Sequence, residues 1–190
     1  IEGRAVYLAS VPVTPSPDVS YETRLVATAG TVETTEEIAT FCAGGVENCE
    51  LLPVGRAGAA RGFLERTPTE CNLWRTDGTS AGTVEVRTLG AFCASYLWAP
   101  VSAGSRVYFF ADGLWASDGT DSGTERVVSP ELLNGSAQFE PGAAPLANGD
   151  LVFALNTVNS GAEPWISDGT AAGTRRLVDL TATAAHDATT

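Results

Sequence analysis

The chain contains three close copies of one pattern, and this internal repetition constrains the architecture more than any other feature of the sequence. The copies are LWRTDGTSAGTVEV at 73–86, LWASDGTDSGTERVV at 114–128 and PWISDGTAAGTRRLV at 164–178. A degraded fourth copy, LVATAGTVETTEEI at 25–38, keeps the turn glycine and threonine but lacks the Trp and the Asp. We therefore expect four similar structural units.

Each copy predicts the last hairpin of a small antiparallel sheet. The apolar pair at its start begins a short strand. The Asp-Gly that follows favours a tight turn, because Asp accepts hydrogen bonds from nearby backbone and Gly tolerates positive φ. The residues after the turn alternate or are β-branched, as in a half-buried return strand. The predicted turn residues, with their glycines at positive φ, are Asp77, Gly78, Thr79, Asp118, Gly119, Thr120, Asp168, Gly169 and Thr170.

Two further short strands precede the hairpin in the later units. An apolar strand follows a glycine in AGSRVYFFA (103–111) and NGDLVFAL (148–155), and a Pro-containing segment lies upstream of it in WAPVSAG (98–104) and AAPLANG (143–149), and more loosely in LLPVGRAG (51–58). The glycines of successive hairpin turns are 48, 41 and 50 residues apart. Four short strands at this spacing predict an all-β fold, a β-propeller of four-stranded antiparallel blades with four repeat units.

The units are expected at approximately 1–45, 46–92, 93–137 and 138–181, with a tail at 182–190, in a single propeller domain or part of one. IEGRAVYLA (1–9) matches the glycine-to-strand register of later units, so the first unit lacks its first strand. The tail has neither the Pro nor the Gly of a first strand. We therefore expect other segments of the parent protein or a second copy to complete the propeller, with closure by the tail as the alternative. The connection between second and third strands varies most, which places variable loops on one face.

Charge and composition narrow the classes of partner. The formal net charge is −12, and eleven arginines without a lysine are dispersed along the chain, so no nucleic-acid partner is expected. The apolar runs are strand-sized, which predicts no membrane span. Arginine without lysine, beside abundant Ala, Gly, Thr and Val, indicates a bacterial protein from a GC-rich genome.

The four cysteines predict disulfides. Cys42, Cys49, Cys71 and Cys93 lack the CxxC spacing of zinc or redox sites. Of the three possible pairings we favour Cys42–Cys49 with Cys71–Cys93; four buried thiols are the alternative. Disulfides indicate an oxidising compartment, and we therefore expect a secreted, cell-surface or periplasmic protein.

The repeated polar and aromatic residues favour structural roles. The turn aspartates occur once per unit, so a turn role is favoured over calcium binding, and no cofactor or metal is predicted. Trp74, Trp115 and Trp165 occupy one repeat position, which favours blade packing over stacking on a ligand.

No motif marks a catalytic group. His186 is the only histidine and lies in a Thr- and Ala-rich tail without an evident Ser or Cys partner. The acidic run Glu33, Glu36 and Glu37 favours a solvated face over the paired carboxylates of a glycosidase. Catalytic residues are therefore not predicted.

The motifs LWRTDGTSAGT, LWASDGTDSGT and PWISDGTAAGT resemble the ELWxxDGT repeat family, exported propeller proteins of myxobacteria and their relatives. The resemblance covers most of units two to four, although Asn72 and Gly113 replace the expected Glu, and Glu163 precedes a Pro. The hairpin is also similar to the Asp-box of sialidase propellers, which is a turn element. The resemblance implies a propeller fold and an exported setting and brings no activity. We predict a non-catalytic binding or scaffolding module whose loops contact a protein or carbohydrate; the alternative is a propeller-type hydrolase, either a glycoside hydrolase or sialidase-like.

Overall fold

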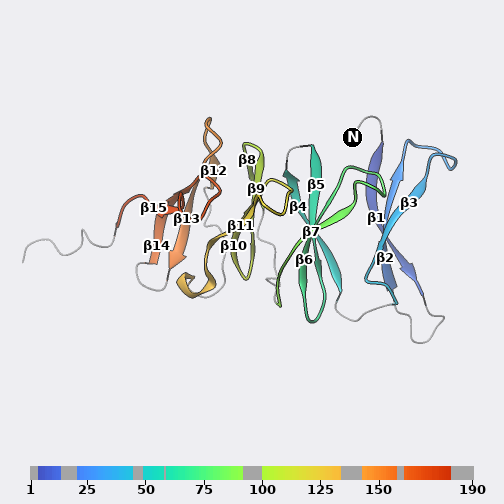
Figure 1. Ribbon diagram of the computed structural model, residues 1–190, viewed down its shortest axis with the longest axis horizontal. Coiled ribbons are helices and arrows are strands. Elements are labelled where there is room, and N and C mark those ends of the chain that lie inside the picture. The colour runs from blue at the N-terminus through green and yellow to red at the C-terminus, as the bar shows by residue number, and fades with distance from the viewer. Residues whose placement is uncertain are drawn as a thin grey trace, which may run out of the picture.

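The computed structural model describes residues 4–13, 21–44, 49–57, 59–91, 100–133, 143–157 and 161–180. These residues form an all-β structure of four antiparallel sheets that follow one another in a row (Figure 1). Helical structure in the described part is limited to the short 3₁₀ helix η1 (Pro130–Leu132), so none of it forms a membrane-spanning helix. The tail at 182–190, with His186, lies outside the described residues.

Each sheet contains one of the predicted repeat units, and within each sheet every strand pairs with the strand before it. The first sheet comprises β1 (Ala5–Pro12), β2 (Tyr21–Thr28) and β3 (Glu36–Phe41). The second comprises β4 (Glu50–Ala57), β5 (Ala60–Arg66), β6 (Cys71–Thr76) and β7 (Val84–Gly90). The third comprises β8 (Val101–Ala103), β9 (Arg106–Ala111), β10 (Gly113–Ser117) and β11 (Thr124–Val128). The fourth comprises β12 (Ala144–Pro145), β13 (Leu151–Thr157), β14 (Gly161–Ser167) and β15 (Arg175–Arg176).

The first sheet has three strands among the described residues, and these contain no counterpart of the first strand of the repeat. Tyr7 of β1 pairs with Val26 of β2, as Phe63 of β5 pairs with Trp74 of β6, so β1 is the counterpart of β5. The register differs by one residue from the one expected from the glycine spacing, which aligns Tyr7 with Tyr108, whereas the strand pairing aligns Tyr7 with Phe109. The last return strand is short: β15 ends at Arg176. Beyond it, the Leu177 N–H donates to the Pro164 backbone oxygen and the Leu180 N–H donates to Glu163 Oε2, both at 2.8 Å.

The core lies between the sheets. Because side chains alternate across a strand, β9 contributes to two apolar clusters. Val107 and Phe109 pack in the cluster between the second and third sheets, and Tyr108 and Phe110 pack in the cluster between the third and fourth. A third cluster, which includes Phe41, joins the first and second sheets. The third sheet is thus buried on both faces, and face-to-face packing holds the row together.

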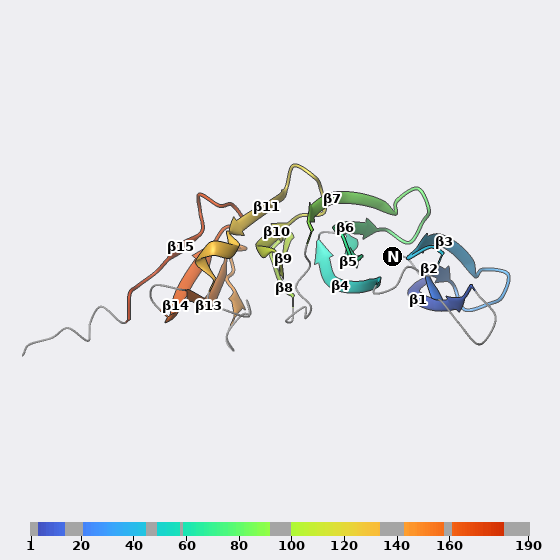
Figure 2. The same ribbon diagram turned by 90° about the horizontal axis from the view of Figure 1, so that it is seen from below.

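The first strands of neighbouring sheets lie close to one another. β8 contacts both β4 and β12, and no comparable set of contacts joins the described return strands. Figure 2 shows β4 and β8 on one side of the row and β7 and β11 on the other. Gly104 and Gly149, at the turns after β8 and β12, meet so closely that a Cβ on Gly104 would lie 3.1 Å from the Gly149 Cα. The sheets therefore converge at their first strands.

Candidate functional site

The repeated turn is built around one carboxylate oxygen. In the second unit, Asp77 Oδ1 accepts a hydrogen bond from the Thr79 backbone N–H at 2.9 Å and another from the Thr79 hydroxyl at 2.7 Å. The Thr79 Oγ1 accepts a hydrogen bond from the Gly82 N–H at 2.9 Å. The Asp and Thr of the motif therefore satisfy the polar groups of the turn locally.

The other complete turns repeat this network. Asp118 and Asp168 each accept the same two hydrogen bonds, at 2.9 and 2.7 Å, from the threonine two residues later. Gly78, Gly119 and Gly169 have φ angles of 89°, 87° and 89°. The predicted positive φ of the turn glycines is therefore confirmed, and a residue with a Cβ would be strained at these positions.

The degraded first turn replaces the carboxylate with a hydroxyl. Ala29 stands at the Asp position, and Thr34 stands where the second unit has Gly82. Thr34 Oγ1 accepts hydrogen bonds from the Ala29 and Thr31 N–H groups, both at 3.2 Å. A Cβ on Gly82 would overlap the Asp77 carboxylate. The two positions are therefore coupled, since Asp requires Gly and the smaller Ala makes room for Thr.

The turn lowers the pKa of its carboxylate. The hydrogen bond from the Thr79 hydroxyl is the main reason that the pKa of Asp77 lies below 3.8, and the Thr170 hydroxyl has the same effect on Asp168. Partial burial is the largest influence on Asp118 and raises its pKa, but hydrogen bonds from Thr120 and other favourable interactions outweigh it, so this pKa is also lowered. Each turn thus stabilises the ionised form of its aspartate.

The preceding sheet contacts the turn of the fourth unit. Arg106 of β9 donates a hydrogen bond from Nη1 to the Asp168 backbone oxygen at 2.9 Å. The Tyr108 hydroxyl, also on β9, donates to the Ser167 backbone oxygen at 3.2 Å, and burial raises the pKa of Tyr108. These hydrogen bonds join the third and fourth sheets in addition to their apolar packing.

A related contact joins the second and third sheets through a different residue. Arg87 of β7 donates to Asp121 Oδ1 and to the Thr124 backbone oxygen, both at 2.7 Å. Sequence reasoning did not single out this arginine or the pair on β9, because their partners lie 34 to 62 residues away in the chain. Only the placement of neighbouring sheets reveals their partners.

The three repeated tryptophans pack towards the preceding sheet. Trp74 packs against the cluster between the first and second sheets, Trp115 lies in the next cluster, and Trp165 packs against the last. The indole N–H of Trp74 donates to Glu65 at 3.1 Å and that of Trp115 to Asp112 at 3.0 Å. The Trp165 N–H is buried and has no hydrogen-bond partner among the described residues. All three indole rings therefore lie at contacts between neighbouring sheets.

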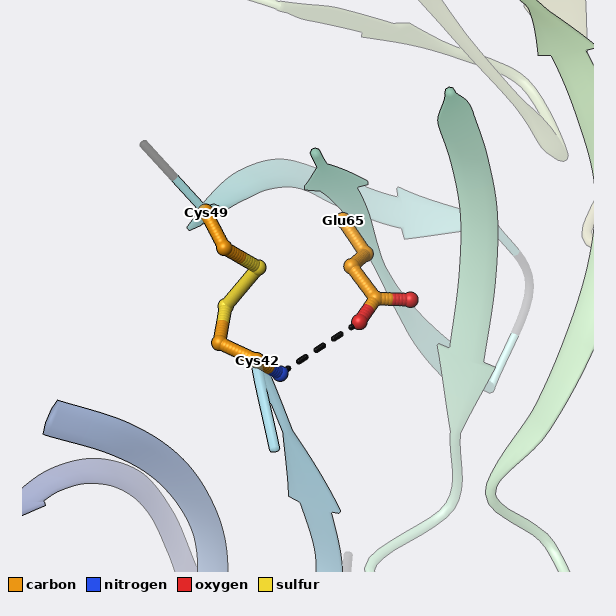
Figure 3. A group of neighbouring side chains, drawn as sticks. All are labelled: Cys42, Cys49 and Glu65. Atoms are coloured by element: carbon orange, nitrogen blue, oxygen red, sulfur yellow. Dashed lines mark hydrogen bonds between the residues drawn. A yellow bond between two sulfur atoms is a disulfide. The ribbon is translucent and has the colours of Figure 1, made fainter. Parts of the chain in front are cut away.

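In the described residues, two cysteines and a glutamate place potential metal-ligating atoms within 4.8 Å of one another (Figure 3). Cys42 and Cys49 are joined by a disulfide, as predicted, so their sulfurs are not thiolate ligands. Glu65 accepts a hydrogen bond from the Cys42 N–H at 3.5 Å as well as from the Trp74 indole. Glu65, which the sequence did not mark, connects this disulfide to the second sheet.

Of the second predicted disulfide, only Cys71 lies in the described residues. Cys71 is disulfide-bonded, and the described residues contain no free cysteine. Cys93, its predicted partner, lies outside the described residues. The alternative of four buried thiols is therefore wrong for the three described cysteines.

The acidic run of the first unit lies on the surface. Glu36 pairs with Arg4 at 2.8 Å, and Glu37 pairs with Arg24 at 3.0 Å. A shallow open depression beside these pairs is lined in part by Arg4 and Glu33. The exposure of these side chains agrees with the solvated face expected from the sequence.

The connections between second and third strands lie at the opposite end of the sheets from the repeated turns. In the second unit this connection is a loop in which Thr67 Oγ1 accepts hydrogen bonds from Thr69 and Glu70 N–H groups at 3.3 and 3.0 Å. In the third unit it shrinks to Asp112 between β9 and β10. The corresponding residues 14–20 and 158–160 lie outside the described residues. The strand ends that carry the repeated turns are therefore alike in all units, whereas the connections at the opposite strand ends differ from unit to unit.

No family model matches the chain, and no significantly similar curated protein was found. The resemblance to ELWxxDGT repeats therefore depends on the three motif copies themselves.

Proposed function

We propose that the four sheets are blades of a β-propeller that serves as a non-catalytic, exported binding or scaffolding module. The proposal for the fold is supported by face-to-face sheets whose first strands converge, which is how propeller blades surround an axis. The motif resemblance to ELWxxDGT repeats supports the same fold. The Cys42–Cys49 disulfide supports an oxidising, extracytoplasmic setting.

The observation that carries the binding role is the difference between the two ends of the sheets. The repeated turns use their Asp and Thr groups in their own hydrogen bonds, as Asp118 does with Thr120. The opposite end has a loop of four residues at 67–70 and a single residue, Asp112, at the corresponding place in the next unit. Variable loops on a rigid scaffold are the common location of binding sites. We place the ligand site at this variable end, with a protein or a glycan as the ligand.

A glycan array run beside a panel of glycoside hydrolase and sialidase substrates tests this function. The expected result is saturable binding of a glycan class without turnover. A variant in which Asn-Gly replaces residues 67–70 should weaken binding at least tenfold if this loop contacts the ligand. The matched control is Ala81→Glu, an exposed change at the uniform end, which should bind like the unaltered protein. Turnover of any substrate, or equal loss of binding in both variants, would contradict the proposal.

A further inference from the structure

The outer face of the fourth sheet exposes apolar side chains whose counterparts in the third sheet are buried. Leu177 and Val178 are 44% and 47% exposed, whereas Val127 and Val128 are 6% and 3% exposed. The four residues are equivalent, because Trp165 pairs with the residue before Leu177 just as Trp115 pairs with the residue before Val127. The fourth sheet covers the third, and no described residues cover the fourth in the same way.

The central strands of the fourth sheet show the same difference. Tyr108 and Phe110 of β9 are fully buried against the fourth sheet. Val152 and Ala154 occupy the equivalent positions on β13 and are partly exposed, as is Ile166 on β14. We call Val152, Ala154, Ile166, Leu177 and Val178 the sheet-4 end face.

The first sheet exposes its other face. In the other three sheets, the equivalent face packs on the preceding sheet. Tyr7 is 44% exposed, whereas Phe63 and Phe109 at the equivalent positions are 5% and 0% exposed. No atom of the described residues lies within 4 Å of a Cβ placed on Gly30, whereas the same test on Gly119 meets Ala57 of the preceding sheet. We call Ala5, Tyr7, Val26 and the turn at Gly30 the sheet-1 end face.

These two end faces are the two halves of an interface that already occurs three times within the chain. Each internal interface joins the face equivalent to the sheet-4 end face with the face equivalent to the sheet-1 end face. The first and fourth sheets lie at opposite ends of the row in both views, so the two end faces of one copy do not meet (Figures 1 and 2). An apolar sheet face left in water favours association with a complementary face.

We propose that a second copy of this chain docks head to tail, with the sheet-1 end face of each copy on the sheet-4 end face of the other. This inference rests on the propeller fold proposed above, since convergent first strands curve the row towards closure. Two copies give a ring of eight sheets, which is within the range of four to eight blades seen in propellers. A head-to-tail contact that closes in this way produces a finite assembly rather than a filament.

Light scattering on a size-exclusion column, over a series of concentrations, tests the assembly. The expected mass is twice the 19.7 kDa of one chain. Leu177→Arg on one end face and Tyr7→Arg on the other should each give a monomer, because either change places a charge in both interfaces. Leu132→Arg is the matched control, since Leu132 of η1 is 43% exposed and belongs to neither end face, and it should remain dimeric. Circular dichroism establishes that all three variants keep the β-sheet spectrum.

Mixing the two monomeric variants distinguishes head-to-tail docking from other contacts. Leu177→Arg retains an intact sheet-1 end face, and Tyr7→Arg retains an intact sheet-4 end face, so an equimolar mixture should recover dimers through one interface. A monomeric unaltered protein, an open series of larger masses, a dimeric Leu177→Arg variant or a mixture that stays monomeric would each overturn the docking proposal. Ligand binding measured on the Leu177→Arg monomer reports on the proposed function separately.

Discussion

At the scale of single residues, the Asp-Gly turn depends on a few side-chain atoms that must fit together and complete its hydrogen bonds. The sequence was sufficient to predict the turn and the positive φ of Gly78, because these follow from local backbone chemistry. It did not predict that Thr34 takes the place of the carboxylate in the first unit. The side chain of Thr34 fills the space that the Asp77 carboxylate fills in the second unit. The sequence does not show that these two repeat positions share one space.

The coupling between these positions predicts a non-additive double-mutant cycle. Asp77→Ala alone removes two hydrogen bonds, and Gly82→Thr alone places a side chain against the Asp77 carboxylate. The double variant reproduces the arrangement of Ala29 with Thr34. We expect the double variant to lose less free energy of unfolding than the two single variants lose together. The difference should be about 0.5–3 kcal/mol, the range for residues in contact. Urea unfolding of the four proteins measures this term, and additive losses would show that the positions are independent.

The lowered pKa values of the turn aspartates predict acid sensitivity with a definite sign. A carboxylate with a folded-state pKa below its unfolded value stabilises the fold above the unfolded pKa, and this contribution is lost as pH falls through the folded pKa. For Asp77 and Asp168 the loss should therefore begin near pH 3.8 and continue below it. Replacing both by Asn keeps the accepting oxygen and removes the titration. Thermal melts from pH 6 to 2 should fall less steeply for this variant; parallel curves would argue against the assignment.

At the scale of elements, neighbouring sheets are joined by polar contacts as well as by apolar area. Successive side chains of a strand point to opposite faces, so the apolar residues of β9 divide between two clusters. This division can be predicted from the sequence. Which turn meets Arg106 or Tyr108 depends on how the sheets are placed, because the partner residues are about sixty positions away in the chain. Contacts of this kind are therefore found only in the structure.

The hydroxyl of Tyr108 provides a direct test of contact between the third and fourth sheets. Tyr108→Phe keeps the buried ring and removes the hydrogen bond to the Ser167 carbonyl. We expect a loss of about 1 kcal/mol in the free energy of unfolding, the usual contribution of one such bond. Tyr21→Phe is the control, because Tyr21 is 56% exposed and should change stability little. Equal effects of the two substitutions in urea unfolding would refute the contact.

The Cys42–Cys49 disulfide predicts a loss of stability on removal. The bond closes a short loop, with a sequence separation of 7, and constraint of the unfolded chain by such a loop contributes roughly 2–3 kcal/mol. Replacing both cysteines by alanine should lower the urea midpoint, and reducing agent should have no further effect at this site. The second disulfide is followed separately by mass mapping of alkylated peptides. An unchanged midpoint would contradict a stabilising role.

At the scale of the whole molecule, the repeat predicts more than the individual residues do. Four units of short strands were expected from the spacing of the turn glycines, and four antiparallel sheets are present. The exposed end faces could not be predicted, because Leu177 and Val127 are both apolar and occupy the same repeat position. Their exposures of 44% and 6% differ because the fourth sheet covers Val127, whereas no sheet among the described residues covers Leu177.

Single-particle electron microscopy of the protein tests most directly whether the four sheets are blades that surround an axis. We expect discs with radial lobes around a centre, one lobe for each sheet, with the first strands innermost. Straight rows of sheets without curvature, or compact particles without radial lobes, would contradict this arrangement.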